Sequence, residues 1–161
     1  MRRAPRWVLE VLEASYASDY VVVGGGAIIA AFVSREAVTA HWSIVLAAEL
    51  ACYGALPWLR SRPPRVIEGP AVIESREPML RRLNTAILDG ASVQANTLPS
   101  GHVAGALAAS LALGAFIPSA GMVLGLLALL IAVSAALCRY HYVVDCVSGA
   151  AVAILVWVIV A

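Results

Sequence analysis

Two histidines stand at the ends of long apolar segments, where they are well placed for chemistry. His102 closes the run Pro99-Ser100-Gly101-His102, which opens an apolar segment of about 20 residues. His141 lies four residues before Asp145, between two further apolar segments. Residues spaced i and i+4 share one face of a helix, so the carboxylate can accept a hydrogen bond from one ring nitrogen of the histidine. The other ring nitrogen is then free to act as a nucleophile.

The residues around these histidines are suited to holding an anion. A helix start offers unpaired backbone N–H groups and a positive dipole end, which favours an anion at Ser100, Gly101 and His102. Gly101 lets the backbone approach that anion closely. Arg62 and Arg139 would add bidentate contacts to phosphate oxygens. We expect no metal ion at these residues.

The composition indicates that a membrane positions these residues. The chain has 161 residues, of which 61% are hydrophobic and 13% charged, and its mean hydropathy is +0.87. A bilayer core needs about 20 apolar residues per helix. The sequence therefore predicts a single all-α domain over residues 1–161, an integral membrane helical bundle with about five transmembrane helices plus interfacial helices. The expected spans cover approximately residues 14–33, 37–59, 98–117, 119–138 and 142–161.

Two further segments are expected at the membrane surface. Residues 1–13 combine arginines with Trp7 and predict a short interfacial helix. Residues 60–97 form a long polar loop, in which Met79, Leu80, Leu83 and Ile87 recur at helical spacing and predict an amphipathic helix. This helix either admits a lipid substrate or only caps the bundle, and the sequence favours neither. Residues 98–161 are expected to form the catalytic helices.

The number of spans brings the candidate residues together. With five spans, the span ends near residues 59, 98, 138 and 142 lie on one membrane face. Each motif alone has a structural explanation, such as a helix start, a helix stop or a hydrogen bond within the bundle. Their common face makes a shared site the better explanation. The residues expected to meet there are Arg62, Ser100, His102, Arg139, His141 and Asp145.

These residues resemble the signatures of the type-2 phosphatidic acid phosphatase superfamily, integral-membrane lipid phosphatases that share a core with vanadium haloperoxidases. The second signature, Pro-Ser-Gly-His, is complete at residues 99–102. The third signature is met at Ser134, His141 and Asp145, and the first at Arg62-Pro63. The resemblance covers roughly residues 55–150.

Two positions depart from the family pattern. The lysine of the first signature falls on Ala55, and the arginine of the third falls on Ala135. Arg139 lies four residues after Ala135, so we expect it one helical turn along the same face. Arg60 or Arg65 is the candidate to replace the lysine. An arginine two residues before the histidine, together with Arg-Pro-Pro-Arg, resembles the branch that contains inositol phosphorylceramide synthases.

The resemblance implies a phosphatase that acts on a lipid or polyprenyl phosphate or diphosphate, without a cofactor and without nucleic acid as a partner. His141 would attack phosphorus, Asp145 would orient it, and His102 would serve as general acid and then general base. The residues expected to hold the phosphate are Arg62, Arg65, Arg139, Ser100 and Gly101. Two alternatives stay open: a phospho-headgroup transferase of the same fold, and a non-catalytic protein that binds lipid phosphates.

The arginines also predict an orientation. Ten of the eleven arginines fall on the catalytic face and only Arg35 on the other. The positive-inside rule then places the catalytic face in the cytoplasm of a cell whose inner membrane holds the protein. Many members of the family act on the outer face instead, so the charge distribution and the resemblance point in opposite directions. We follow the charge distribution.

Overall fold

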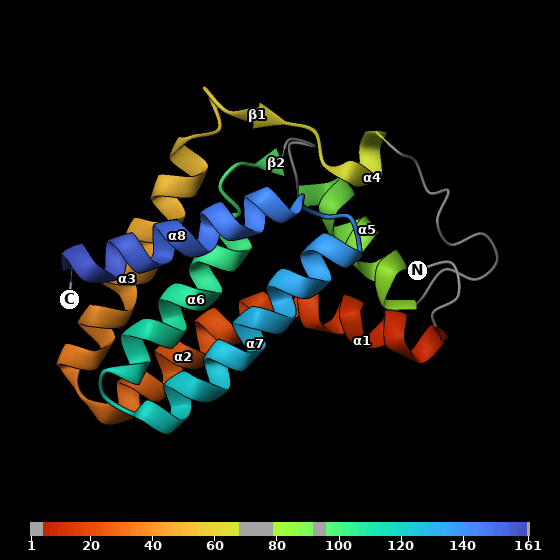
Figure 1. Cartoon of the computed structure of the whole chain (residues 1–161). Helices are drawn as coiled ribbons and strands as arrows, with labels where there is room; N and C mark the ends of the chain where they lie inside the picture. The colour runs from red at the N-terminus through yellow and green to blue at the C-terminus, as the bar shows by residue number, and fades with distance from the viewer. Residues whose placement is uncertain (1–4, 68–78, 92–95, 161) are drawn as a thin grey trace.

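The structure, a computed structural model, describes residues 5–67, 79–91 and 96–160. It is almost entirely helical, which confirms the predicted all-α class (Figure 1). Two short strands, β1 (Arg60–Ser61) and β2 (Asn96–Thr97), pair antiparallel at the base of the long polar loop. The helices are α1 (Arg6–Ala17), α2 (Asp19–Val33), α3 (Arg35–Gly54), α4 (Pro64–Ile67), α5 (Met79–Ala91), α6 (Gly101–Gly114), α7 (Pro118–Leu137) and α8 (Val143–Val160).

Helix α6 forms the centre of the bundle. It packs against α2, α3, α7 and α8, and ten of its 14 residues are buried. Most of these residues are alanine, glycine or serine, which allow neighbouring helices to approach closely. Gly121 of α7 lies directly against the backbone of Gly114, where a Cβ atom would collide with it. The small residues noted in the sequence thus serve helix packing at this crossing.

The structure only partly confirms the expected number of membrane spans. Among the described residues, α7 and α8 are long and apolar enough to cross a bilayer, and α1 with α2 would form a third span bent by 48°. The expected span 98–117 corresponds to α6, whose 14 residues extend only about 21 Å. That length is short of the ~30 Å hydrocarbon core. The expected span 37–59 corresponds to α3, which carries Arg35, Glu36 and Glu49.

The amino-terminal boundary also differs from the prediction. The interfacial segment was expected to end at residue 13 and a span to begin at residue 14. Instead, α1 continues to Ala17, and α2 begins at Asp19 after a bend at Ser18. The backbone N–H of Ser18 still bonds to carbonyls of α1, whereas its own carbonyl accepts the N–H of Val22 in α2. The change of helix direction therefore falls between residues 17 and 19.

The predicted amphipathic helix is present as α5, and its apolar face is the exposed one. Helix α5 exposes Met79, Leu83 and Ile87, while its polar Asn84 is buried and Arg81 is 18% exposed. The polar face of α5 therefore packs on the protein, and its apolar face points outward. This is the reverse of a surface helix on a soluble protein.

The structure confirms that the four predicted span ends lie on one side of the molecule. The end of α3, the start of α6, the end of α7 and the start of α8 lie on one side of the molecule with β1, β2, α4 and α5 (Figure 1). The turns that join α2 to α3 and α6 to α7 lie on the opposite side (Figure 1). Backbone hydrogen bonds connect the converging ends, from Arg65 N–H to the carbonyl of Arg139 at 3.1 Å and from Ser100 N–H to the carbonyl of Asp145 at 2.9 Å.

Candidate active site

The start of α6 places His102 deep inside this end of the bundle. Ser100 is the N-cap residue, and its side-chain oxygen accepts the N–H of Val103 at 3.5 Å. Ser100 is fully buried, and Gly149 of α8 packs so closely on its backbone that a Cβ atom would collide there. Gly101 lies against the ring of Tyr53. The first turn of α6 is thereby held rigidly against α8 and α3.

The turn between α7 and α8 carries the second histidine. Helix α7 ends at Leu137, and Arg139 has a φ of 65°. The N–H of Arg139 bonds to the carbonyl of Ala136, and that of Tyr140 to the carbonyl of Ala135. This is the Schellman arrangement, in which the left-handed position is usually glycine. The expectation that Arg139 lies one helical turn beyond Ala135 on the same face is therefore wrong, because the helix has already ended.

His141 and Asp145 are close, but they do not share a helix as expected. Helix α8 begins at Val143, so His141 precedes it and Asp145 lies in its first turn. Oδ2 of Asp145 accepts the N–H of Tyr142 at 2.9 Å and lies 3.5 Å from Nδ1 of His141. The latter distance suits an ion pair and is long for a hydrogen bond. Hydrogen bonds of this kind commonly shorten when a substrate binds.

The two imidazole rings face one another across a short gap. The ring centroids of His102 and His141 are 6.0 Å apart, at an interplanar angle of 57°. His141 is 4% exposed. Tyr16 of α1 stacks on His102 with centroids 5.0 Å apart, and Tyr20 of α2 meets the same ring edge-on at 6.2 Å. Aromatic side chains from the amino-terminal helices thus complete the surroundings of the histidines.

Arg65 supplies a positive charge beside the histidines. Its guanidinium lies 5.4 Å from the ring centroid of Tyr140 and is near enough to His102 for its charge to act on that imidazole. Burial lowers the pKa of Arg65, whose guanidinium nevertheless stays charged because its ordinary value is so high. Arg62 has an exposed side chain, whereas the neighbouring Pro63 is fully buried. Within this segment, Arg65 is the arginine that the fold brings to the histidines.

A family model places this geometry among known proteins. The model described as the PAP2 superfamily matches residues 40–161. The chain belongs to the PAP2 superfamily. Both histidines and Asp145 lie within the match, which confirms the resemblance predicted from the sequence. No curated protein and no solved structure matches the chain. Membership of the PAP2 superfamily gives the chain a phosphatase-type fold and supports an enzyme of the phosphoric ester hydrolase kind.

The two departures from the PAP2 pattern have identifiable places in the fold. Ala55, at the lysine position, is the C-cap residue of α3. Ala135, at the arginine position, is fully buried, and its carbonyl accepts the N–H groups of both Tyr140 and His141. Arg65, whose charge acts on His102, is a candidate to replace a missing cation. Arg60, the other candidate, lies in β1.

The sequence did not point to several residues that surround this candidate site. Glu13, Tyr16 and Tyr20 precede the matched region, and Arg81 lies in α5. The only signal was the helical spacing of Glu13, Tyr16 and Tyr20, which is also typical of ordinary buried residues. Among the described residues, no group of three or more histidine, cysteine or acidic side chains could hold a metal ion.

Proposed function

We propose that this PAP2 protein is a metal-independent phosphatase that hydrolyses a lipid or polyprenyl phosphate or diphosphate through a phosphohistidine intermediate. The observation that carries the proposal is the pair of facing imidazoles, His102 and His141, with Asp145 against the second. Reacting atoms approach to about 3–3.5 Å before reaction. Two rings 6.0 Å apart can therefore bracket one phosphoryl group.

In the first step, Nε2 of His141 attacks phosphorus, and the bond from phosphorus to the leaving oxygen breaks. His102 donates a proton to that oxygen, which leaves as an alcohol or as a phosphate. The charge on the phosphorylated imidazole is stabilised by Asp145, whose carboxylate faces Nδ1 at 3.5 Å. In the second step, His102 takes a proton from water, the oxygen attacks phosphorus, and the bond from phosphorus to His141 breaks.

The transferred group needs positive charge and N–H donors around its oxygens. Arg65 is half-buried beside the histidines and is the leading candidate for this role. Arg62, Arg139, Ser100 and Gly101 are the further phosphate-binding residues that we propose. The Gly101 amide belongs to the first turn of α6, where the helix dipole favours an anion.

The surroundings of the site support a lipid substrate. Helices α7 and α8 are long and apolar enough to cross a membrane, and the site lies where they meet. A substrate anchored in the bilayer by its chain would present its phosphate at this end of the bundle. We place the protein in the inner membrane with this end facing the cytoplasm, because every arginine among the described residues except Arg35 belongs to it.

The test is phosphate release by the detergent-purified protein in the presence of EDTA. The substrates are phosphatidate, phosphatidylglycerophosphate, polyprenyl mono- and diphosphates, and a soluble phosphate ester. His141→Ala is expected to abolish release. His41→Gln is the matched control, because His41 is also buried but bonds to the carbonyl of Val23 within α2 and α3. Release that survives His141→Ala would remove His141 from the nucleophile role.

Two other outcomes have definite meanings. Transfer of the phosphoryl-bearing group to added polyol, seen as a new product, would establish a transferase of the same fold. Binding of lipid phosphate without turnover across the whole panel, by protein shown to be folded, would establish a non-catalytic carrier. Either result would overturn the proposed hydrolysis.

A further inference from the structure

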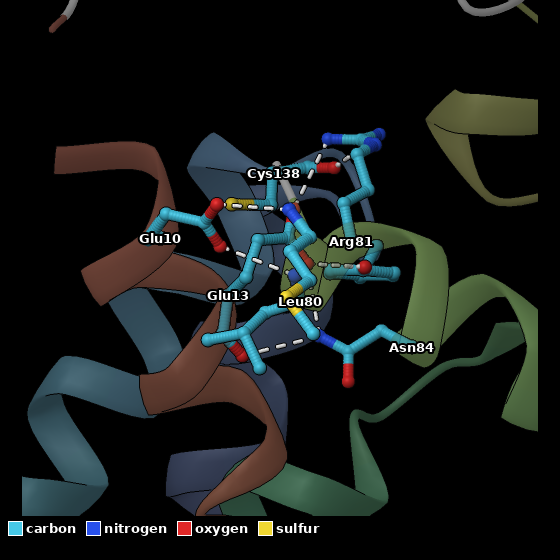
Figure 2. Close-up of polar contacts among 8 residues, drawn as sticks. Glu10, Glu13, Leu80, Arg81, Asn84 and Cys138 are labelled. Carbon is cyan, nitrogen blue, oxygen red and sulfur yellow. Dashed lines mark hydrogen bonds and ion pairs between the residues drawn. The ribbon is translucent and has the colours of Figure 1, made fainter. Parts of the chain in front are cut away.

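A buried carboxylate on α1 ties together three separate parts of the chain. Glu13 is 1% exposed. Its Oε2 accepts the Tyr140 hydroxyl at 2.6 Å and Nδ2 of Asn84 at 2.9 Å, and its Oε1 accepts Nη1 of Arg81 at 3.2 Å. Figure 2 shows Arg81 and Asn84 of α5 reaching Glu13 from one side. A buried carboxylate is stable only when it is paired in this way.

Tyr140, the residue before His141, is fixed on every side. It is 1% exposed, and its ring stacks on Tyr16 with centroids 3.9 Å apart and an interplanar angle of 9°. Burial and the hydrogen bond to Glu13 raise the pKa of Tyr140, so its hydroxyl stays protonated and donates. The N–H groups of Tyr140 and His141 both bond to the carbonyl of Ala135. A fixed Tyr140 therefore fixes the backbone of His141.

Tyr16 extends this contact to the other histidine. One stacking partner is Tyr140, and the other is His102, with ring centroids 5.0 Å apart and an interplanar angle of 20°. Tyr16 lies three residues after Glu13 on α1, so both project from one face of the helix. One face of α1 thus contacts both His102 and Tyr140, the residue before His141.

Helix α5 is fastened to the same face of α1. The carboxylate of Glu10 accepts the N–H groups of Met79 at 2.8 Å and Leu80 at 3.1 Å, which caps the start of α5 (Figure 2). Nη2 of Arg81 also donates to the carbonyl of Cys138 at 3.4 Å, at the end of α7 (Figure 2). Helix α5 therefore bonds to both α1 and the end of α7 and holds them together.

We propose that Glu13 and Tyr16 are positioning residues, which set the distance and angle between the imidazoles of His102 and His141. Glu13 acts through the Tyr140 hydroxyl, and Tyr16 acts through its stacking on Tyr140 and His102. The residues that the family model matches begin at position 40, so this device lies in the part of the chain that precedes the match. The proposal rests on the phosphatase function proposed above.

The principal test replaces the stacked ring. Tyr16→Leu removes the aromatic face, while Tyr16→Phe keeps it and loses only the hydroxyl. With the preferred substrate, kcat of Tyr16→Leu is expected to fall on the order of 100-fold, because misplacing a reacting group by about 1 Å costs that much. KM should change less than twofold, and Tyr16→Phe should match the wild type. Trp7→Leu, the same kind of change on the exposed side of α1, is the control.

A second variant and a second measurement keep the proposal testable. Tyr140→Phe removes one oxygen atom and should fold even where Tyr16→Leu does not; its kcat is expected to fall about tenfold. The chain has three histidines, so their ring protons can be assigned by NMR in detergent. Tyr16→Leu should move the His102 resonance, which loses its stacked ring, and leave that of His41 in place.

The outcomes separate this proposal from the function on which it rests. Unchanged kcat in Tyr16→Leu and Tyr140→Phe would overturn the positioning role, and so would an unmoved His102 resonance in Tyr16→Leu. A purely structural role would lower the yield of folded protein and leave kcat per folded molecule intact. A wild type without phosphate release would contradict the phosphatase function alone. A His141 resonance that stays in place in Tyr16→Leu would then count against the positioning role, because Tyr16 stacks on His102 and Tyr140 and should affect His141 through them.

Discussion

The three histidines of this chain show how the surroundings separate similar side chains. His41 is fully buried and bonds through Nε2 to the carbonyl of Val23 at 3.1 Å, within the bundle. His102 and His141 face each other instead, and a carboxylate lies against the second ring. His41 and His141 are both buried, so burial does not distinguish the structural histidine from the candidate nucleophile. Their neighbours do.

Arg139 occupies a backbone position that favours glycine. Its φ of 65° is left-handed, which costs about 1 kcal/mol for a residue with a side chain. Such strain often persists where a side chain is needed for function. The strain therefore agrees with the proposed role of Arg139 in holding phosphate.

Arg139→Gly is expected to stabilise the protein and to reduce its activity. Relief of the left-handed strain should raise the free energy of unfolding by about 1 kcal/mol, and loss of the guanidinium should lower kcat/KM at least about tenfold. Thermal unfolding in detergent and phosphate release measure the two effects. Arg139→Lys keeps the strain and should leave the unfolding temperature unchanged. A variant with glycine that is both less stable and fully active would contradict the prediction.

At the scale of the element, α5 has two faces with different partners. Its polar face binds Glu13 through Arg81 and Asn84, and its exposed face carries Met79, Leu83 and Ile87. An outward apolar stripe beside the site suits the boundary between headgroups and acyl chains. The sequence left open whether this helix admits a lipid substrate or only caps the bundle, and the outward apolar stripe favours the first role.

Serine at both Leu83 and Ile87 should impair action on lipids in vesicles without harming the enzyme itself. Each change removes exposed apolar area that would otherwise lie in the bilayer interface. We expect kcat/KM to fall about tenfold for a lipid phosphate in vesicles and to stay unchanged for a soluble phosphate ester. Equal losses on both substrates would indicate that the stripe packs within the protein.

The crossing of α6 and α7 depends on two glycines. A Cβ atom at Gly121 would collide with the backbone of Gly114. Gly121→Ala is therefore expected to destabilise the protein by about 1–3 kcal/mol, measured by thermal unfolding in detergent. Gly24→Ala on α2 is the matched control, since nothing lies within 4 Å of its Cβ position. Similar unfolding temperatures for the two variants would show that the helices separate without cost.

At the scale of the whole molecule, the fold is one-sided. The candidate site, the strand pair and the surface helices gather at one end of the bundle (Figure 1). The helix turns on the opposite side bear few charges, and Arg35 is the arginine at that end among the residues that the structure describes. Such asymmetry of arginines sets the orientation of many membrane proteins.

Cysteine labelling in intact cells checks this orientation. Thr85 on α5 and Ser119 at the start of α7 are both exposed and lie at opposite ends of the molecule. With an impermeant reagent, Thr85→Cys should react only after the cells are opened, and Ser119→Cys should react in intact cells. The three native cysteines are buried, so they contribute little background. The reverse pattern would place the candidate site on the outer face.

Much of this architecture could be predicted from local sequence. The apolar runs predicted α7 and α8, and the motif at residues 99–102 predicted the helix start at α6. The helical spacing of Met79, Leu80, Leu83 and Ile87 predicted α5. Spacing was less informative where helices end. Asp145 is at position i+4 relative to His141, yet α8 starts between them, at Val143. Helix boundaries depend on capping contacts, which the spacing of side chains does not reveal.

By itself, the sequence determined the helical membrane class, the family and the two histidine motifs, because these depend on composition and on residues adjacent in the chain. Only the tertiary structure decided which side chains surround the histidines. Glu13 meets Tyr140 across 127 positions, and Arg65, rather than the exposed Arg62, is half-buried beside the ring of Tyr140. Such contacts arise from the packing of distant helices. No local pattern distinguishes a tyrosine that stacks on a histidine from one that only fills the core.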